Sequence, residues 1–209
     1  MPLLDHFHPP LSEVRHWEGF HARWASALVD ELNLTLLPPG YFAEPLRSWG
    51  MDELGHAAAP TFPDAFEVHV FAAGIHPRLV AAIELASPTS KGRADRRRAF
   101  AARCAGYLSR GAGTIIVDVV TNQEGNLHNE VVRLTADAMT NLPPSDEPLY
   151  AAAYRAIRRD GAGRLEVWLE ALAVGKALPI MPLWLKADLC LPINLETTYA
   201  DACRRLRLS

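Results

Sequence analysis

The sequence predicts a single-domain α/β protein. Amphipathic helical segments alternate with short apolar runs that are typical of buried strands. A strand, a helix and a second strand follow one another over residues 78–120, and a right-handed crossover would make those strands parallel. The 209 residues, 49% hydrophobic and 22% charged, suit one folded domain (1–209), with a core at about residues 11–120 and a C-terminal elaboration at about residues 121–209.

The first expected helix covers Leu11–Leu32, with Ser12 as its N-cap. Its apolar and aromatic stripe recurs at helical spacing and consists of Val14, Trp17, His21, Trp24 and Leu28. Two prolines and Gly40 then predict a turn over residues 36–40. Tyr41–Trp49 is a weaker candidate for a strand.

Two strands are expected next. Pro63–Phe71 alternates between apolar and polar residues, and Asp64 lies at its start. A turn over residues 72–77 leads to Arg78–Ala86, a nearly continuous apolar run that is typical of a strand covered on both faces. Glu84 is the one acidic residue in that run.

An arginine-rich helix is expected over Ser90–Arg110. Its core stripe consists of Phe100, Cys104, Tyr107 and Leu108. Thr114–Val120 follows as another buried strand, with Asp118 as its only charge. The C-terminal third predicts a hairpin of Leu149–Ile157 with Arg164–Leu172, a strand over Pro179–Leu185 and a closing helix over Leu195–Leu206.

Glu84 needs a partner, because burying a carboxylate without compensation is costly. If the two strands are neighbours, Asp64 and Glu84 can reach one point, where Mg²⁺ or Mn²⁺ would neutralise both. Such a cation could also activate water for attack on a phosphodiester. The structural alternative pairs Glu84 with an arginine of the following helix and leaves Asp64 as a cap. The arginines that could do so are Arg93, Arg96 and Arg103.

The order of these motifs resembles a known family. Pro63-Asp64, a strand ending in Ile83-Glu84-Leu85-Ala86-Ser87-Pro88, an arginine-rich helix and a hydrophobic strand are similar to the Uma2-type proteins of the PD-(D/E)XK nuclease superfamily. A bacterial family of unknown function, common in cyanobacteria and planctomycetes, is an even closer likeness and covers nearly the whole chain. That likeness rests on Trp17, His21, Leu37-Pro38-Pro39-Gly40-Tyr41, the Ile83–Pro88 segment, Lys91, Asp118, Leu178, Pro179, Pro182, Leu183 and Tyr199.

The resemblance implies a restriction-endonuclease-like fold, a mixed central sheet flanked by helices, with a C-terminal β-hairpin elaboration and a closing helix. In that pattern Asp64 and Glu84 bind Mg²⁺ or Mn²⁺. The catalytic lysine is expected two residues after the glutamate, where this chain has Ala86. Lys91, at the start of the next helix, is the candidate that could reach back instead. A third acid would come from Asp30, Glu31 or Asp118.

Two functions follow as hypotheses. The first is a divalent-metal-dependent nuclease or phosphodiesterase with Asp64, Glu84 and Lys91 as catalytic residues and nucleic acid as its partner. Phosphate contacts would then come from Arg93, Arg96, Arg97 and Arg103, unless these form the solvated face of a helix. The second is a catalytically degenerate binding or assembly module. Ala86 and the net charge of −3, which gives no general attraction to nucleic acid, favour the second.

The remaining expectations concern location and assembly. Three widely spaced cysteines, no signal peptide and no apolar run of about 20 residues favour a cytoplasmic protein without a membrane partner. An apolar surface of Val167, Trp168, Leu169 and Trp184 is a hypothesis for a homodimer contact, with burial in the core as the alternative.

Overall fold

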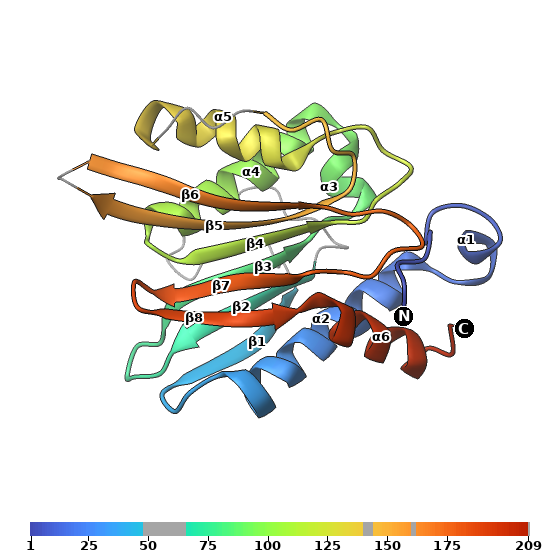
Figure 1. The fold of residues 1–209 in the computed structure, drawn as a ribbon, viewed down its shortest axis with the longest axis horizontal. Helices are drawn as coiled ribbons and strands as arrows, with labels where there is room; N and C mark the ends of the chain where they lie inside the picture. Colours follow the sequence, from blue (N-terminus) through green and yellow to red (C-terminus); the bar gives the residue numbers. More distant parts are fainter. Residues whose placement is uncertain (48–65, 140–143, 160–161, 209) are drawn as a thin grey trace.

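The computed structural model describes residues 1–47, 66–139, 144–159 and 162–208 (Figure 1). The helices are α1 (Leu11–Val14), α2 (Trp17–Glu31), the short π-helix η1 (Leu32–Leu36), α3 (Pro88–Gly92), α4 (Ala94–Ser109), α5 (Leu127–Met139) and α6 (Leu195–Arg205). The strands are β1 (Tyr41–Arg47), β2 (Phe66–Ala72), β3 (Arg78–Leu85), β4 (Gly113–Asp118), β5 (Tyr150–Arg159), β6 (Ala162–Ala171), β7 (Ile180–Lys186) and β8 (Leu189–Asn194). No helix in these ranges is both long and apolar enough to cross a membrane.

Within these described ranges, the central sheet has six strands in the order β1-β2-β3-β4-β5-β6. Among these described strands, only β3 and β4 run parallel, and α3 and α4 form the crossover between them. The other neighbours are antiparallel. The α/β class, the mixed sheet and the parallel pair expected from the sequence are therefore confirmed. The predicted C-terminal hairpin, now β5 and β6, joins this sheet beside β4, and β7 pairs with β8 in a separate two-stranded sheet.

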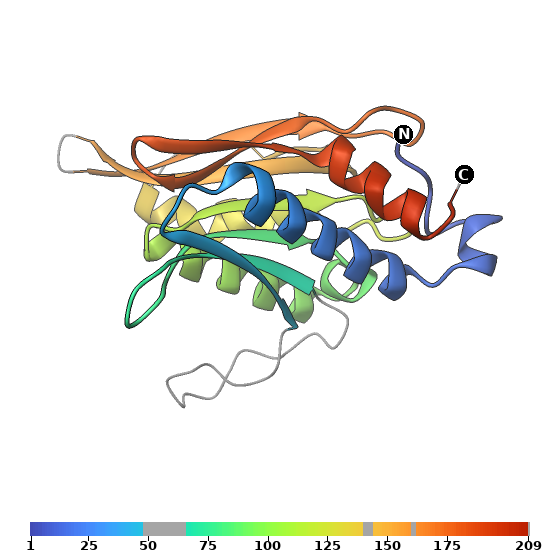
Figure 2. The ribbon, with the colours of Figure 1, turned by 90° about the horizontal axis from the view of Figure 1, so that it is seen from below.

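Helices cover both faces of the central sheet (Figures 1 and 2). One core lies between the sheet and helices α4 and α5. The other, larger core lies between the opposite face and a layer of α2, β7, β8 and α6. Successive residues of β5 alternate between them, because side chains of a strand point to opposite faces. Tyr150 and Tyr154 enter the first core, whereas Ala151 and Ala153 enter the second.

The N-terminal segment packs against the C-terminal helix. The hydroxyl of Tyr199 on α6 accepts a hydrogen bond from the amide of Leu4 at 2.9 Å. The same hydroxyl is hydrogen-bonded to His6 Nε2 at 2.8 Å. Beside this contact, Trp24 of α2 donates to Thr198 at 3.1 Å, so α2 and α6 lie side by side (Figure 2). Burial lowers the pKa of His6 to about 4. The N-terminal segment is therefore held against α6 by hydrogen bonds to Tyr199.

Both predicted long helices are interrupted. Extended backbone at Arg15 separates α1 from α2, so Ser12 caps neither helix and Val14 lies exposed. Extended backbone at Arg93 likewise separates α3 from α4. Ser87 caps α3 by accepting from the amide of Ser90, which completes a capping box. Helix α5 and strand β8 had not been predicted.

Candidate functional site

Glu84 lies on β3 with a side chain that is only 1% exposed. Strand β2 runs antiparallel beside it and places Glu67 directly opposite. Both carboxylates therefore occupy the same face of the sheet, beneath α4. Two buried like charges in direct cross-strand register would repel each other, so this arrangement requires a cation.

Arg103 of α4 supplies that cation. Its Nε and Nη2 donate to the two oxygens of Glu84 at 3.1 and 2.9 Å, which is the bidentate geometry of a strong charge-assisted pair. The same Nε lies 3.0 Å from Glu67 Oε1. Of the three arginines considered from the sequence as partners of Glu84, the structure thus selects Arg103.

Two further side chains complete what we call the carboxylate cluster, formed by Glu67, His69, Glu84, Arg103 and Tyr107. The hydroxyl of Tyr107, one turn after Arg103 on α4, donates to Glu67 at 2.8 Å. His69 Nε2 lies 3.0 Å from Glu67 and 3.1 Å from the Tyr107 hydroxyl oxygen. Every member contacts another member, so the cluster ties β2 and β3 to α4.

The two acids of the carboxylate cluster have pKa values that are shifted in opposite directions. Burial raises the pKa of Glu84, although Arg103 opposes that shift. Burial acts in the same direction on Glu67, but hydrogen bonding to His69 and the charge of Arg103 outweigh it and lower its pKa. Desolvation of Arg103 is outweighed by the two carboxylates, so the guanidinium pKa is raised. The guanidinium is therefore charged at every physiological pH.

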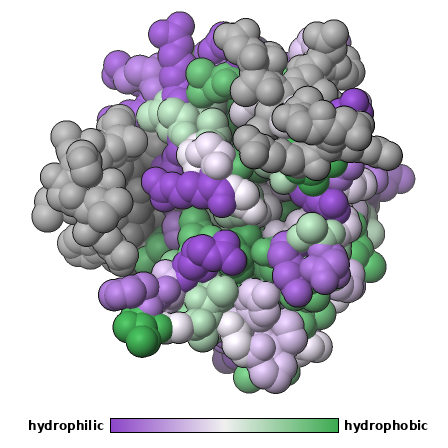
Figure 3. All heavy atoms as spheres, turned by 90° about the vertical axis from the view of Figure 1, so that its left-hand side faces the viewer, coloured by the Kyte–Doolittle hydropathy of each residue, from purple (hydrophilic) through white to green (hydrophobic). Residues whose placement is uncertain are grey.

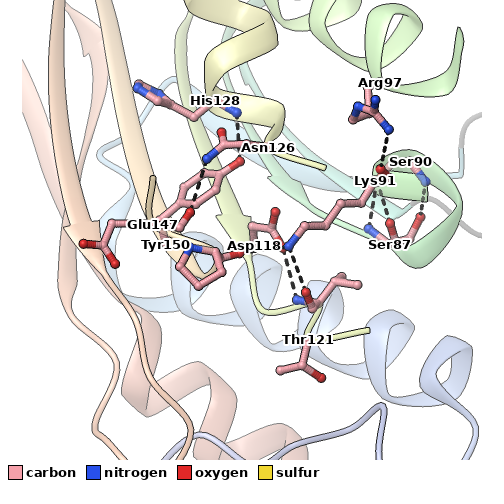
Figure 4. Close-up of polar contacts among 12 residues, drawn as sticks. Ser87, Ser90, Lys91, Arg97, Asp118, Thr121, Asn126, His128, Glu147 and Tyr150 are labelled. Carbon is pink, nitrogen blue, oxygen red and sulfur yellow. Dashed lines mark hydrogen bonds and ion pairs between the residues drawn. The ribbon is translucent and has the colours of Figure 1, made fainter. Parts of the chain in front are cut away.

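Lys91 lies in a different place, pointing from α3 into the protein (Figure 4). Its side chain is 1% exposed, and its ammonium donates to Asp118 Oδ1 at 3.1 Å. It also donates to the carbonyl oxygens of Val120 at 2.8 Å and Pro148 at 2.9 Å. An ammonium has three donors, so these acceptors satisfy it completely, and none of them belongs to Glu84.

Asp118 ends β4 and binds Lys91 from the sheet side. Its Oδ1 also accepts from the amide of Val120 at 3.1 Å. Burial raises the pKa of this carboxyl group to about 6, against the opposing charge of Lys91. The pair therefore links α3, the end of β4 and the chain before β5, which are separated in sequence.

The other predicted site residues are dispersed. Asp64 lies outside the described residues. Arg93 pairs with Asp95 at the surface, and Arg97 donates to the backbone carbonyls of Lys91 and Gly92. Arg96 is partly buried on α4.

The two helical acids considered as a third ligand lie on α2. Asp30 is exposed and lies 3.5 Å from Arg23, whereas partial burial raises the pKa of Glu31. Within the described ranges, no three His, Cys, Asp or Glu side chains form a group that could hold a metal.

The sequence did not lead us to predict Glu67 as a member of the site. It also gave no prediction that His69 and Tyr107 contact Glu67. A signal was available: Glu67 and His69 alternate with buried Val68 and Val70, so both must point to the opposite, helix-covered face of a central strand. Tyr107 follows Arg103 by four residues, which places both on one side of α4.

No family model, no curated protein and no solved structure matches the chain.

Proposed function

We propose that this protein is a catalytically degenerate relative of the nuclease-like proteins, acting as a binding or assembly module and not as a phosphodiesterase. The observation that supports this most directly is the bidentate contact of Arg103 with Glu84. In the nuclease pattern that glutamate should face a metal ion. Here both of its oxygens accept hydrogen bonds from a guanidinium that is itself nearly buried.

The fold supports the proposed relationship. A helix, three antiparallel strands, a helical crossover and a parallel strand follow in order, from α2 through β4. The restriction-endonuclease-like fold implied by the sequence resemblance is likewise a mixed sheet flanked by helices. We therefore assign the chain to that fold as part of this proposal.

The described residues do not fit a Mg²⁺ or Mn²⁺ ion at Glu84. A divalent cation prefers free carboxylate oxygens, and a guanidinium already placed between Glu84 and Glu67 would repel it. Lys91, which the nuclease hypothesis needs beside the acids, is held by Asp118 and two carbonyl groups. Glu84 and Lys91, two of the three residues named for catalysis, thus have complete structural partners.

The metal-dependent nuclease is the second candidate, and one feature favours it: two carboxylates lie side by side on β2 and β3, with Lys91 directed inward and not into solvent. It differs from the first candidate in a measurable way. If Glu84 holds a metal, metal affinity and cleavage must depend on Asp64 and Glu84.

The experiment compares the native protein with Asp64→Ala, Glu84→Gln and, as a matched control, Glu170→Gln on the exposed surface of β6. Calorimetric titration with Mn²⁺ and cleavage assays on single- and double-stranded DNA and RNA are run for each. We expect no cleavage by any variant and the same Mn²⁺ response in all four proteins. Cleavage by the native protein and the control that both other substitutions abolish would overturn the proposal.

A further inference from the structure

A pocket of about 440 Å³ opens between the β5-β6 hairpin and the β7-β8 sheet. It shares no residue with the carboxylate cluster or with the Lys91–Asp118 pair. The side chains that matter for its chemistry are Arg155, Glu166, Trp184 and Lys186. Figure 3 views the molecule from this end, where hydrophilic side chains gather between hydrophobic ones. Its volume falls in the range of small-molecule sites, about 300–1,000 Å³.

The wall of the pocket is fixed by close backbone packing. A Cβ atom on Gly113 of β4 would lie 2.1 Å from the carbonyl oxygen of Trp184, so only glycine allows β7 to approach here. The Trp184 ring in turn packs against Trp168 of β6, with ring centroids 5.8 Å apart. The indole is therefore held between two sheets, and of the lining residues only Gly111 and Ala187 lie outside strands.

The guanidinium of Arg155 lies over the Trp184 ring, 3.9 Å from its centroid. That stacking sets the orientation of the guanidinium. Within the described residues its side chain donates no hydrogen bond. Glu166, opposite Arg155 on β6, is its ion-pair partner, but the distance of 3.6 Å from Glu166 Oε2 to Arg155 Nε exceeds that of a hydrogen bond. Arg155 Nε and Trp184 Nε1 are both buried without an acceptor in the part of the chain that the structure describes.

Buried donors without acceptors are rare in native proteins, and here two of them belong to side chains that line one pocket. Lys186, at the end of β7, adds a second cation at the pocket, and its only ion pair within the described ranges is with the exposed Asp188 at 3.3 Å. The pocket thus combines two cations and surplus donors with a single acidic side chain, Glu166.

From this chemistry we infer that the pocket binds a small organic oxyanion, a phosphate ester or a carboxylate. Its charged group lies against Arg155 and Lys186, and Glu166 accepts a hydrogen bond from a hydroxyl or amino group of the same molecule. A planar guanidinium with free donors matches the geometry of both oxyanions. This inference rests on the proposed binding role and names the class of ligand.

The test is a calorimetric titration with ribose 5-phosphate, lactate and neutral ribose, which separates a phosphate from a carboxylate and both from the sugar alone. The quenching of tryptophan fluorescence gives a second readout, because Trp184 lines the site. We expect at least one of the two anions to bind and ribose not to bind. Affinity should fall at least tenfold in Arg155→Met and severalfold in Lys186→Met.

Lys176→Met, at an exposed lysine outside the pocket, serves as the matched control and should bind as the native protein does. Lys186 is half-exposed, so its variant tests the inference even if Arg155→Met folds poorly. Failure of both anions to bind, or equal affinities in native protein, Arg155→Met and Lys186→Met, would overturn the inference. The nucleic-acid cleavage assay is unaffected by that outcome, so failure of this pocket and failure of the non-catalytic proposal are distinguishable.

Discussion

Replacing Arg103 with methionine removes the counter-ion of two buried carboxylates at once. Glu84 and Glu67 have side chains that are 1% and 4% exposed, so solvent cannot replace the guanidinium. Breaking a buried ion pair by deleting one partner costs about 3–5 kcal/mol. With two acids left behind, we expect the upper part of that range, which is a large share of the roughly 5–15 kcal/mol that stabilises a typical domain.

Protonation sets how this loss depends on pH. Burial already raises the pKa of Glu84, and without Arg103 it rises further. A carboxyl group whose pKa is higher in the folded than in the unfolded chain stabilises the fold at low pH and loses that contribution as pH increases. The loss of unfolding free energy in Arg103→Met should therefore be larger at pH 7.5 than at pH 5.

Urea unfolding followed by circular dichroism measures both effects. Arg98→Met is the matched control, since Arg98 is an exposed residue of the same helix and should change the free energy of unfolding by less than about 0.5 kcal/mol. Adding Glu84→Gln to Arg103→Met should recover part of the loss, because one buried charge is removed. An Arg103→Met protein as stable as the Arg98→Met control at pH 7.5 would refute the reasoning.

Three further predictions use the same unfolding assay. Lys91→Met breaks the buried pair and should cost about 3–5 kcal/mol, whereas Lys176→Met at the surface should cost less than about 0.5 kcal/mol; equal costs would contradict the pair's role. Gly113→Ala drives a methyl group into the backbone of β7 and should destabilise by about 3 kcal/mol or more, whereas Gly106→Ala, with open space inside α4, should stabilise by about 0.5–1 kcal/mol. Because the pKa of His6 is about 4 in the folded protein, against about 6.5 for an exposed histidine, the unfolded chain takes up its proton first, and stability should fall by about 3 kcal/mol between pH 7 and pH 4. A His6→Gln variant with the same pH dependence would contradict that assignment.

The strands of the central sheet could be predicted because their patterns depend on neighbours in sequence. Apolar runs and alternation identified β2, β3 and β4, and the strand–helix–strand order predicted their parallel pair. Helix α5 was not predicted, although Leu127, Val131 and Leu134 recur at helical spacing. The polar residues around them obscured this apolar pattern.

The partners of the buried charges were only partly predictable. Arg103 lies between Phe100 and Tyr107 on the stripe that was expected to face the core, so helical periodicity alone could have selected it over Arg93 and Arg96. The acceptors of Lys91 could not have been found in this way. Two of them are backbone carbonyls, which carry no sequence signal, and one of those is 57 residues away.

The packing of α2 against α6 has a consequence for how the chain folds during synthesis. The aromatic face of α2, with Phe20 and Trp24, is covered in part by Tyr199 from the far end of the sequence. The ribosome synthesises α2 long before α6. The part of this apolar face that Tyr199 covers therefore stays exposed until the rest of the chain has been synthesised. Contacts of such long sequence separation slow folding and leave intermediates open to aggregation, which makes α2 a natural segment for a chaperone to hold during translation.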